Sequence, residues 1–194
     1  ASPSAVECHV GESLRLDIWF KHAWIDIQSS TRDWSFMWAE STAANTVADT
    51  AQYALPIDYR SVIADSFVFN GKYLPFMDFY EFRKSYKLLS ATGLPAVFTV
   101  TPNNGKIEFY PIPDAAYSFQ YDYFKIPQVM SANTDTPALA SHYHQAIVWL
   151  ALKFYGEYEQ DVDIVSVGNS EYSRQMTAIC NEFLPDMKLG EALA

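Results

Sequence analysis

The sequence predicts an α+β fold in which a three-helix domain is built from both ends of the chain and an antiparallel β-sheet or barrel-like domain is inserted between them. Three observations support this prediction. Apolar residues recur at helical spacing near both ends, apolar and polar residues alternate in short runs through the middle, and turn residues separate those runs. We expect a helical domain of residues 1–31 and 136–194 and a β-rich domain of residues 32–135.

The first helix is predicted over residues 11–30, "GESLRLDIWFKHAWIDIQSS". Its apolar residues form a broad stripe at three- and four-residue spacing, and Gly11, Glu12 and Ser13 are typical of a helix start. This stripe predicts a helix that packs one face against other helices.

The middle of the chain is predicted to be an antiparallel sheet. Residues 97–101 lead into "PNNGK" (102–106), whose Asn-Gly pair favours a tight hairpin, so residues 107–110 are the expected partner strand. In "YSFQYDYF" (117–124) the aromatic residues occupy every second position, which predicts a strand with one buried face. Prolines fall mostly at the edges of such runs, where a missing N–H is tolerated.

Helical spacing returns after residue 133 in two segments, residues 133–161 and 161–188. Asp135 or Thr136 is expected to cap the first of them, with Pro137 in its first turn. The second is expected to stop near Pro185. The two helices would form a hairpin that packs with the first helix of the chain.

Composition excludes several functional classes. The chain has 194 residues, of which 49% are hydrophobic and 16% aromatic, so it can bury a core built largely from rings. A net charge of −10 is the wrong sign for tight nucleic-acid binding. We expect Cys8 and Cys180 to be reduced thiols, although a single disulfide between them is also open. Because neither a long apolar run nor a signal-like start is found, we expect a soluble cytoplasmic protein without a membrane partner.

Catalytic and cofactor motifs are not found, so we predict a non-enzyme without cofactor or metal. His142 and His144 lie two residues apart, which on a helix separates them by about 200° and prevents them from sharing a metal. Glu157, Glu159, Asp161 and Asp163 are most simply a solvated charge run.

Two other classes remain open on these residues. The paired acids at 157–163 could instead serve a glycosidase, and Trp34, Phe36, Met37 and Trp38 could form the sugar-stacking patch of a carbohydrate-binding module. The stretch "RKSYK" (83–87) is the candidate basic stripe for nucleic acid. For the rings, packing in a core or a subunit interface is the simpler interpretation.

Six motifs in a fixed order carry a resemblance. They are "DWSFMWAE" (33–40), "TVADTAQYALPIDYR" (46–60), "FNGKYL" (69–74), "GLPAVFTV" (93–100), "IEFYPIPDAAYSFQYDYFKIP" (107–127) and "ASHYHQAIVWLALKFYGEYEQD" (140–161). Together they resemble the head-to-tail adaptor proteins of tailed bacteriophages over roughly residues 12–185. That family has an α-domain made from both ends of the chain, which agrees with the layout predicted from periodicity.

The resemblance implies architectural rather than catalytic roles for the motif residues. It makes Trp34, Phe36, Trp38, Tyr53 and Tyr59 candidates for the core or a subunit interface. Asp58 and Arg60 would bridge neighbouring backbone or the adjacent subunit.

The resemblance also implies partners and a location. Copies would form a closed ring, of twelve in that family, that lies beneath the portal protein and carries the tail or nozzle proteins. This places the chain at the head-tail junction of a virion, assembled in the host cytoplasm, with genomic DNA passing through the ring without specific binding. We expect Glu157, Glu159, Asp161 and Asp163 to face that channel. The residues expected to dock on the portal are Leu184, Met187, Leu189 and Leu193.

Overall fold

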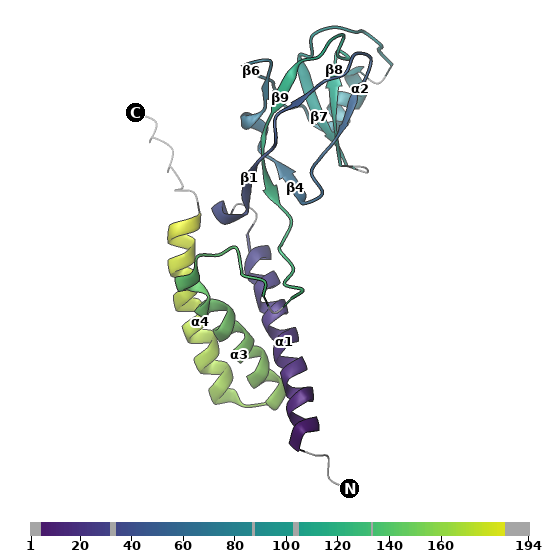
Figure 1. The fold of residues 1–194 in the computed structure, drawn as a ribbon. Helices are drawn as coiled ribbons and strands as arrows, with labels where there is room; N and C mark the ends of the chain where they lie inside the picture. Colours follow the sequence, from purple (N-terminus) through teal and green to yellow (C-terminus); the bar gives the residue numbers. More distant parts are fainter. Residues whose placement is uncertain (1–4, 32–33, 87, 103–104, 133, 185–194) are drawn as a thin grey trace, which may run out of the picture. The chain divides into compact units, whose positions relative to one another are not determined.

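The computed structural model describes the backbone of residues 5–31, 34–86, 88–102, 105–132 and 134–184, and side chains from residue 13 onward. Contacts divide the chain into two compact units, shown in Figure 1. The helical unit comprises Ala1–Met37 and Pro127–Ala194, and the β unit comprises Trp38–Ile126. The fold is of the α+β class, as predicted.

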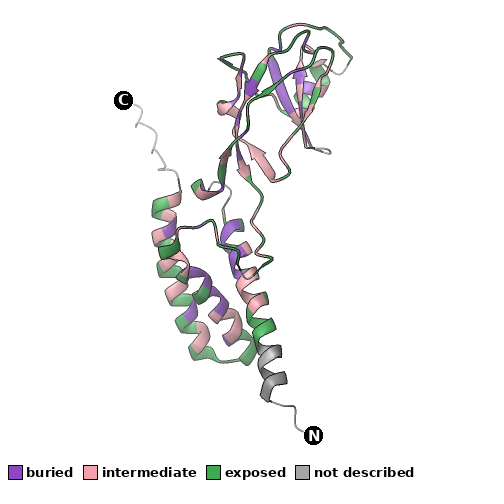
Figure 2. Ribbon diagram, in the orientation of Figure 1, coloured by how far each residue is buried: buried purple, intermediate pink, exposed green. Residues whose placement is uncertain are grey.

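In its described residues, the helical unit contains three α-helices, α1 (Ala5–Ser29), α3 (Gln145–Glu159) and α4 (Val162–Phe183), with short 3-10 turns at Ser35–Met37 and Ser141–Tyr143. Helix α3 packs against both α1 and α4. Its buried side chains face these neighbours, and Figure 2 shows buried residues along all three helices. The buried hydrophobic residues of this unit are Ala23, Trp24, Ile27, Trp34, Met37, Leu139, Ala146, Ile147, Leu150, Ala151 and Ile179.

Two predicted helix starts are wrong. Helix α1 already begins at Ala5, six residues before the predicted Gly11 start. Helix α3 begins at Gln145, and Asp135 does not cap it. Instead the Asp135 carboxylate accepts hydrogen bonds from the backbone N–H groups of Ser131 and Ala132, at 2.7 and 2.8 Å. Asp side chains cap turns as readily as helices, so the residue type alone did not distinguish the two.

The turn between α3 and α4 is short and locally determined. Gln160 adopts a left-handed conformation (φ 58°), and the Asp161 backbone N–H donates to the carbonyl oxygen of Gly156. The Asp161 side chain then accepts hydrogen bonds from the N–H groups of Asp163 and Ile164, at 3.0 and 3.1 Å. Asp161 is therefore the N-cap of α4, a role in which Asp is strongly favoured.

The β unit consists of three small antiparallel sheets, with strand orders β1-β10-β4, β2-β9-β5-β6 and β3-β8-β7. The strands are β1 (Trp38–Glu40), β2 (Ala44–Asn45), β3 (Gln52–Ala54), β4 (Tyr59–Val62), β5 (Val68–Phe69), β6 (Lys72–Tyr73), β7 (Val97–Thr101), β8 (Lys106–Tyr110), β9 (Ser118–Gln120) and β10 (Asp122–Lys125). The β7–β8 hairpin confirms the predicted pairing, with Val97 opposite Tyr110 and Thr101 opposite Lys106.

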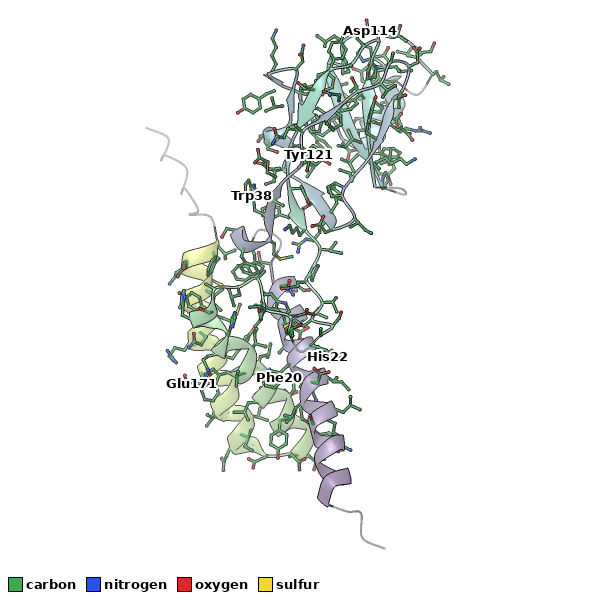
Figure 3. The ribbon with its side chains drawn as sticks, viewed as in Figure 1. Phe20, His22, Trp38, Asp114, Tyr121 and Glu171 are labelled. Carbon is green, nitrogen blue, oxygen red and sulfur yellow. The ribbon has the colours of Figure 1, made fainter. Side chains whose placement is uncertain are left out.

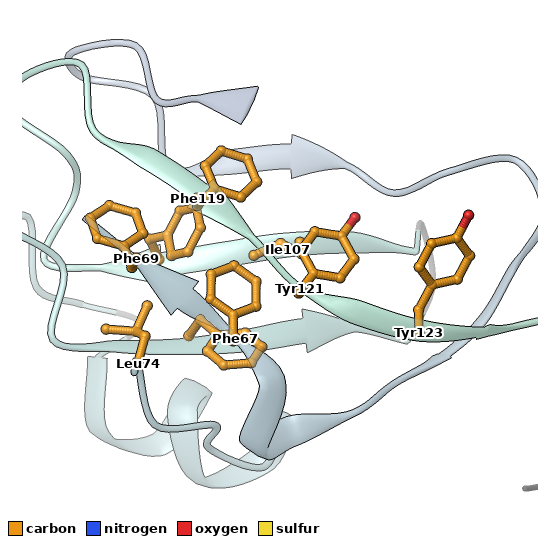
Figure 4. Packing of buried hydrophobic residues seen from close by; sticks show 9 residues of the cluster. Phe67, Phe69, Leu74, Ile107, Phe119, Tyr121 and Tyr123 are labelled. Carbon is orange, nitrogen blue, oxygen red and sulfur yellow. The ribbon is translucent and has the colours of Figure 1, made fainter. Parts of the chain in front are cut away.

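The alternation predicted for residues 117–124 is also confirmed. Phe119, Tyr121 and Tyr123 are buried, and the chain passes from β9 in one sheet to β10 in another. Their side chains join one aromatic core, seen in Figure 4. Within it the Phe67 ring stacks on Tyr121 with centroids 5.2 Å apart, and lies 4.1 Å from Phe98.

A short helix within the β unit, α2 (Phe79–Tyr86), was not predicted. Phe82 on α2 is buried, and α2 packs against β7. The sequence did contain a helix-start signal, because Asp78 directly precedes α2 and Glu81 comes three residues after Asp78. In the structure, the Asp78 carboxylate accepts a hydrogen bond from the Tyr80 N–H at 2.9 Å.

Candidate functional site

The first candidate cluster, the rings that follow α1, belongs mainly to the interior of the helical unit. Trp34 is completely buried, and its Nε1 donates a hydrogen bond to the carbonyl oxygen of Ile27 at 3.0 Å. Phe36 stacks between Trp34 and Trp24, with ring centroids 5.5 and 6.0 Å away. It also meets Phe183 of α4 edge-on at 5.5 Å. A buried Trp34 is not available to stack on a sugar ring, which argues against the carbohydrate-binding alternative.

Trp38 differs from Trp34 although it lies only four residues later. It is the first residue of β1, opposite Phe124 of β10, and 46% of its surface is exposed (Figure 3). Trp38 is therefore the ring of this motif that can contact a partner.

The motif "YALPIDYR" begins with a tyrosine that organises the loop before it. The Tyr53 hydroxyl accepts a hydrogen bond from the Val47 N–H at 2.8 Å and lies 2.9 Å from the carbonyl oxygen of Thr50. Its ring contacts Phe109 and Phe119, each with centroids 5.5 Å apart. Tyr53 thus joins the aromatic core to the loop at 47–50.

The second half of the motif is equally engaged within the β unit. The Asp58 carboxylate accepts a hydrogen bond from the Tyr123 hydroxyl at 3.0 Å, and burial together with this bond raises the pKa of Tyr123. The Tyr59 hydroxyl accepts from the N–H of Val62 at 3.1 Å. Arg60 is half-buried on β4. The Asp58–Tyr123 bond joins the turn before β4 to β10, and the Tyr59–Val62 bond lies within β4, so both contacts are architectural.

The four candidate channel acids gather where α3 ends and α4 begins, and all four are exposed. The Glu157 carboxylate oxygen Oε1 lies 3.9 Å from Lys153 Nζ, one turn earlier on α3. The Asp161 side chain caps α4. Asp161 and Asp163 are at the N-terminus of α4, so they interact favourably with its dipole.

The candidate docking residues lie at the other end of α4. Leu184 is the C-cap of α4, half-buried, with its N–H bonded to the carbonyl oxygen of Cys180. Met187, Leu189 and Leu193 fall outside the described residues.

A groove between α1 and α3 was not predicted. It has a volume of about 390 Å³, and Phe20 in its lining is labelled in Figure 3. The Trp19 ring lies 5.8 Å from Tyr155 and 5.6 Å from Tyr158, and the Arg15 guanidinium sits 5.0 Å above the Tyr158 ring. The other lining residues are Leu16, Val148, Ala151, Leu152 and Glu159. The groove could be found only in the fold, because its two walls are about 130 residues apart in sequence.

The histidines are placed as helix-start residues rather than as ligands. His144 is the N-cap position of α3, and its Nε2 lies 2.9 Å from the carbonyl oxygen of Leu139. His142 Nε2 is 3.9 Å from a Glu182 oxygen. Within the described part of the chain, no group of three or more His, Cys, Asp or Glu side chains is arranged to hold a metal ion. Over the same residues, the helices are too short or too polar to cross a membrane.

Comparison with known proteins gives one family. The chain matches the sequence pattern of the family described as SU10 adaptor protein over residues 9–188, which includes both the helical and the β unit. A search of curated proteins finds none that matches this sequence. Because the match covers nearly the whole chain and both units, this protein belongs to the SU10 adaptor protein family.

Proposed function

We propose that this protein is a structural head-to-tail adaptor whose copies form a closed ring, of twelve subunits, beneath the portal of a tailed bacteriophage. The ring links the capsid to the tail or nozzle proteins, and genomic DNA passes through it. The observation that carries the proposal is the family match over residues 9–188. The architectural contacts of the motif residues support it, since Tyr53 binds the loop at 47–50, Asp58 binds Tyr123 of β10, and Tyr59 binds Val62 within β4.

The decisive experiment is electron microscopy of the full-length chain mixed with the portal protein of the same phage. A ring of density added to one face of the portal, with the same rotational symmetry throughout, is the expected result. Isolated copies that stay separate from the portal at every mixing ratio would contradict the proposal.

We further propose that the end of the chain contacts the portal, through Leu184, Met187, Leu189 and Leu193. Deleting residues 186–194 leaves the described helices intact, because α4 ends at Phe183. The truncated chain is expected to lose portal binding in a co-sedimentation assay while keeping its circular dichroism spectrum. Unchanged binding would assign portal contact to another surface.

The acidic end of the α3–α4 hairpin is proposed to face the DNA channel. A negative wall repels a polyanion weakly, so DNA slides along it without being retained. Changing Glu157 and Asp163 to Lys is expected to slow DNA ejection from particles that carry the variant. Asp161 and Glu159 are left unchanged, because the Asp161 side chain caps α4 and Glu159 lines the groove between α1 and α3.

A matched control separates charge from stability in that experiment. Neutral Glu157→Gln and Asp163→Asn remove the same two charges without adding positive ones. This variant is expected to eject DNA at nearly the normal rate. Normal ejection by the double Lys variant would contradict a channel position for these residues.

A further inference from the structure

The groove between α1 and α3 has the composition of a binding surface. Its walls are rings and aliphatic side chains, including Trp19, Tyr155 and Val148. Two apolar residues of its lining are unusually exposed for a folded chain, Leu16 of α1 at 43% and Val148 of α3 at 39%. Exposed apolar surface of this kind commonly marks a site where another protein binds.

A second exposed apolar feature lies in the β unit, in the loop of residues 88–94 that follows α2, named here the leucine loop. Leu88 is 94% exposed, and Leu89 and Leu94 are both more than half exposed. Backbone hydrogen bonds hold this loop in shape. The Leu89 N–H donates to the carbonyl oxygen of Tyr86. The Ile112 N–H donates to the carbonyl oxygen of Ala91, and the Ile112 carbonyl oxygen accepts from the Gly93 N–H. Because the loop is already ordered, little conformational entropy would be lost when its leucines are buried.

The charges beside these two surfaces are opposite. Arg83 and Lys84 lie in the last turn of α2, directly before the leucine loop. Glu159 lines the groove, and Glu157 lines a second hollow that shares Trp19 with it. Asp161 and Asp163 come next along the chain, at the turn between α3 and α4. Arg15 is the basic residue in the groove lining, and it is positioned over the Tyr158 ring. Opposite charge around matching apolar surfaces favours one partner and one orientation.

We propose that the leucine loop of one copy binds in the α1–α3 groove of a second copy. A closed ring requires a heterologous contact, in which one surface of each subunit fits a different surface of its neighbour. The loop and the groove are such a pair, one projecting and basic, the other concave and acidic at its rim. This inference rests on the proposed ring and adds the surfaces that join its subunits.

Disulfide cross-linking within the assembled ring tests the contact. In a Cys8→Ser, Cys180→Ser background, Leu88→Cys is combined with Val148→Cys in the groove wall, and the ring is assembled on the portal before mild oxidation. Covalent dimers and higher multimers are expected on a denaturing gel. Leu88→Cys combined with Val167→Cys is the matched control, because Val167 is exposed on α4 outside the groove lining. That pair should stay monomeric.

A charge exchange tests the same contact without cysteines. Lys84→Glu and Glu159→Lys alone are each expected to weaken subunit association about two- to fivefold, as measured by sedimentation of the full chain at high concentration or on the portal. The double variant should recover most of that loss, because the pair is restored with reversed sign. Leu88→Asp should weaken association by about tenfold or more, since a leucine would no longer be buried.

The outcomes distinguish this inference from the proposed function. If rings form on the portal but the 88–148 pair does not cross-link and Leu88→Asp assembles normally, the subunits are joined elsewhere and the adaptor function stands. If the cross-link forms between the loop and the portal rather than between copies, the groove is again not the occupied site. If the unmodified chain forms no ring at all, the proposed function fails and this contact with it.

Discussion

At the scale of single residues, the polar atoms of the aromatic side chains decide what each ring does. Trp34 is buried with its indole N–H bonded to Ile27, whereas Trp38 keeps nearly half of its surface in solvent. Tyr53 and Tyr59 bury their rings partly and use their hydroxyls to bind backbone groups, Tyr53 in the loop at 47–50 and Tyr59 at Val62 of β4. Amphipathic rings suit such positions because one side chain serves the core and a loop together.

Changing Tyr53 to Phe should lower the free energy of unfolding by about 0.5–1.5 kcal/mol, because the loop at residues 47–50 loses its hydroxyl partner while the ring stays in place. Urea denaturation followed by fluorescence measures this change. Tyr80→Phe is the matched control, since Tyr80 is 77% exposed, and it should be neutral. Equal effects of the two substitutions would refute a role for the Tyr53 hydroxyl.

Tyr121 makes stability depend on alkaline pH. Burial, and next the nearby Tyr123 and Tyr59, raises its pKa well above the ordinary value of 10.0. The folded chain therefore keeps a proton on Tyr121 that the unfolded chain loses above pH 10, so the contribution of Tyr121 to stability is constant below that pH and falls as pH rises beyond it. Tyr121→Phe should reduce this fall by up to about 1.4 kcal/mol per pH unit. Denaturation curves at pH 8, 10 and 11 test it, and an unchanged slope would contradict it.

At the scale of elements, close approach and capping determine how α3 meets α4. A Cβ on Gly168 would lie 3.0 Å from the Lys153 backbone nitrogen and 3.1 Å from the Trp149 carbonyl oxygen, so the backbone of α3 would have to shift by a few tenths of an ångström to admit it. A Cβ on Gly156 would lie 2.9 Å from the Val165 nitrogen. The two glycines let the helices of the hairpin approach closely, and the Asp161 cap begins α4 at the same turn.

Gly168→Ala should therefore destabilise the chain despite the better helix propensity of Ala. Overpacking against a helix backbone costs about 1–3 kcal/mol, and the propensity gain offsets roughly 1 kcal/mol of this. A net loss of about 1 kcal/mol is expected in thermal or chemical denaturation. Asn169→Ala, at the next and exposed position of α4, gains propensity without a clash and should be neutral or slightly stabilising.

At the scale of the whole molecule, the two units differ in net charge. The helical unit has 6 Lys and Arg against 14 Asp and Glu, a net charge of −8, while the β unit has 7 against 9, a net charge of −2. Most of the acidity of the chain is thus in the unit proposed to face DNA. In the β unit, the first strand pairs with the last, Trp38 opposite Phe124, so the chain enters and leaves that unit at neighbouring points.

A fragment of residues 38–126 is expected to fold alone, because it contains a complete aromatic core and its two ends are paired strands. Dispersed amide signals in an NMR spectrum and a cooperative urea transition would be the measured result. Phe67→Ala in the fragment removes a fully buried ring and should cost about 3–5 kcal/mol. A fragment with collapsed amide dispersion in native buffer would show that its fold depends on the helical unit.

Local patterns in the sequence determined the class of the fold. The alternation at residues 117–124, the Asn104-Gly105 turn and the helical stripes each depend on residues close along the chain, and each predicted the right element. Helix starts were less well determined, because an Asp such as Asp135 can serve a turn as well as a helix.

Only the tertiary structure decided which of these elements meet. Gln28 binds the backbone of Gln128 through both atoms of its amide, and Phe36 packs on Phe183, across separations that no local pattern encodes. The same is true of the different exposure of Trp34 and Trp38, and of the groove between α1 and α3. Burial depends on the neighbours that distant segments bring, and so the surfaces available for assembly follow from packing rather than from residue type.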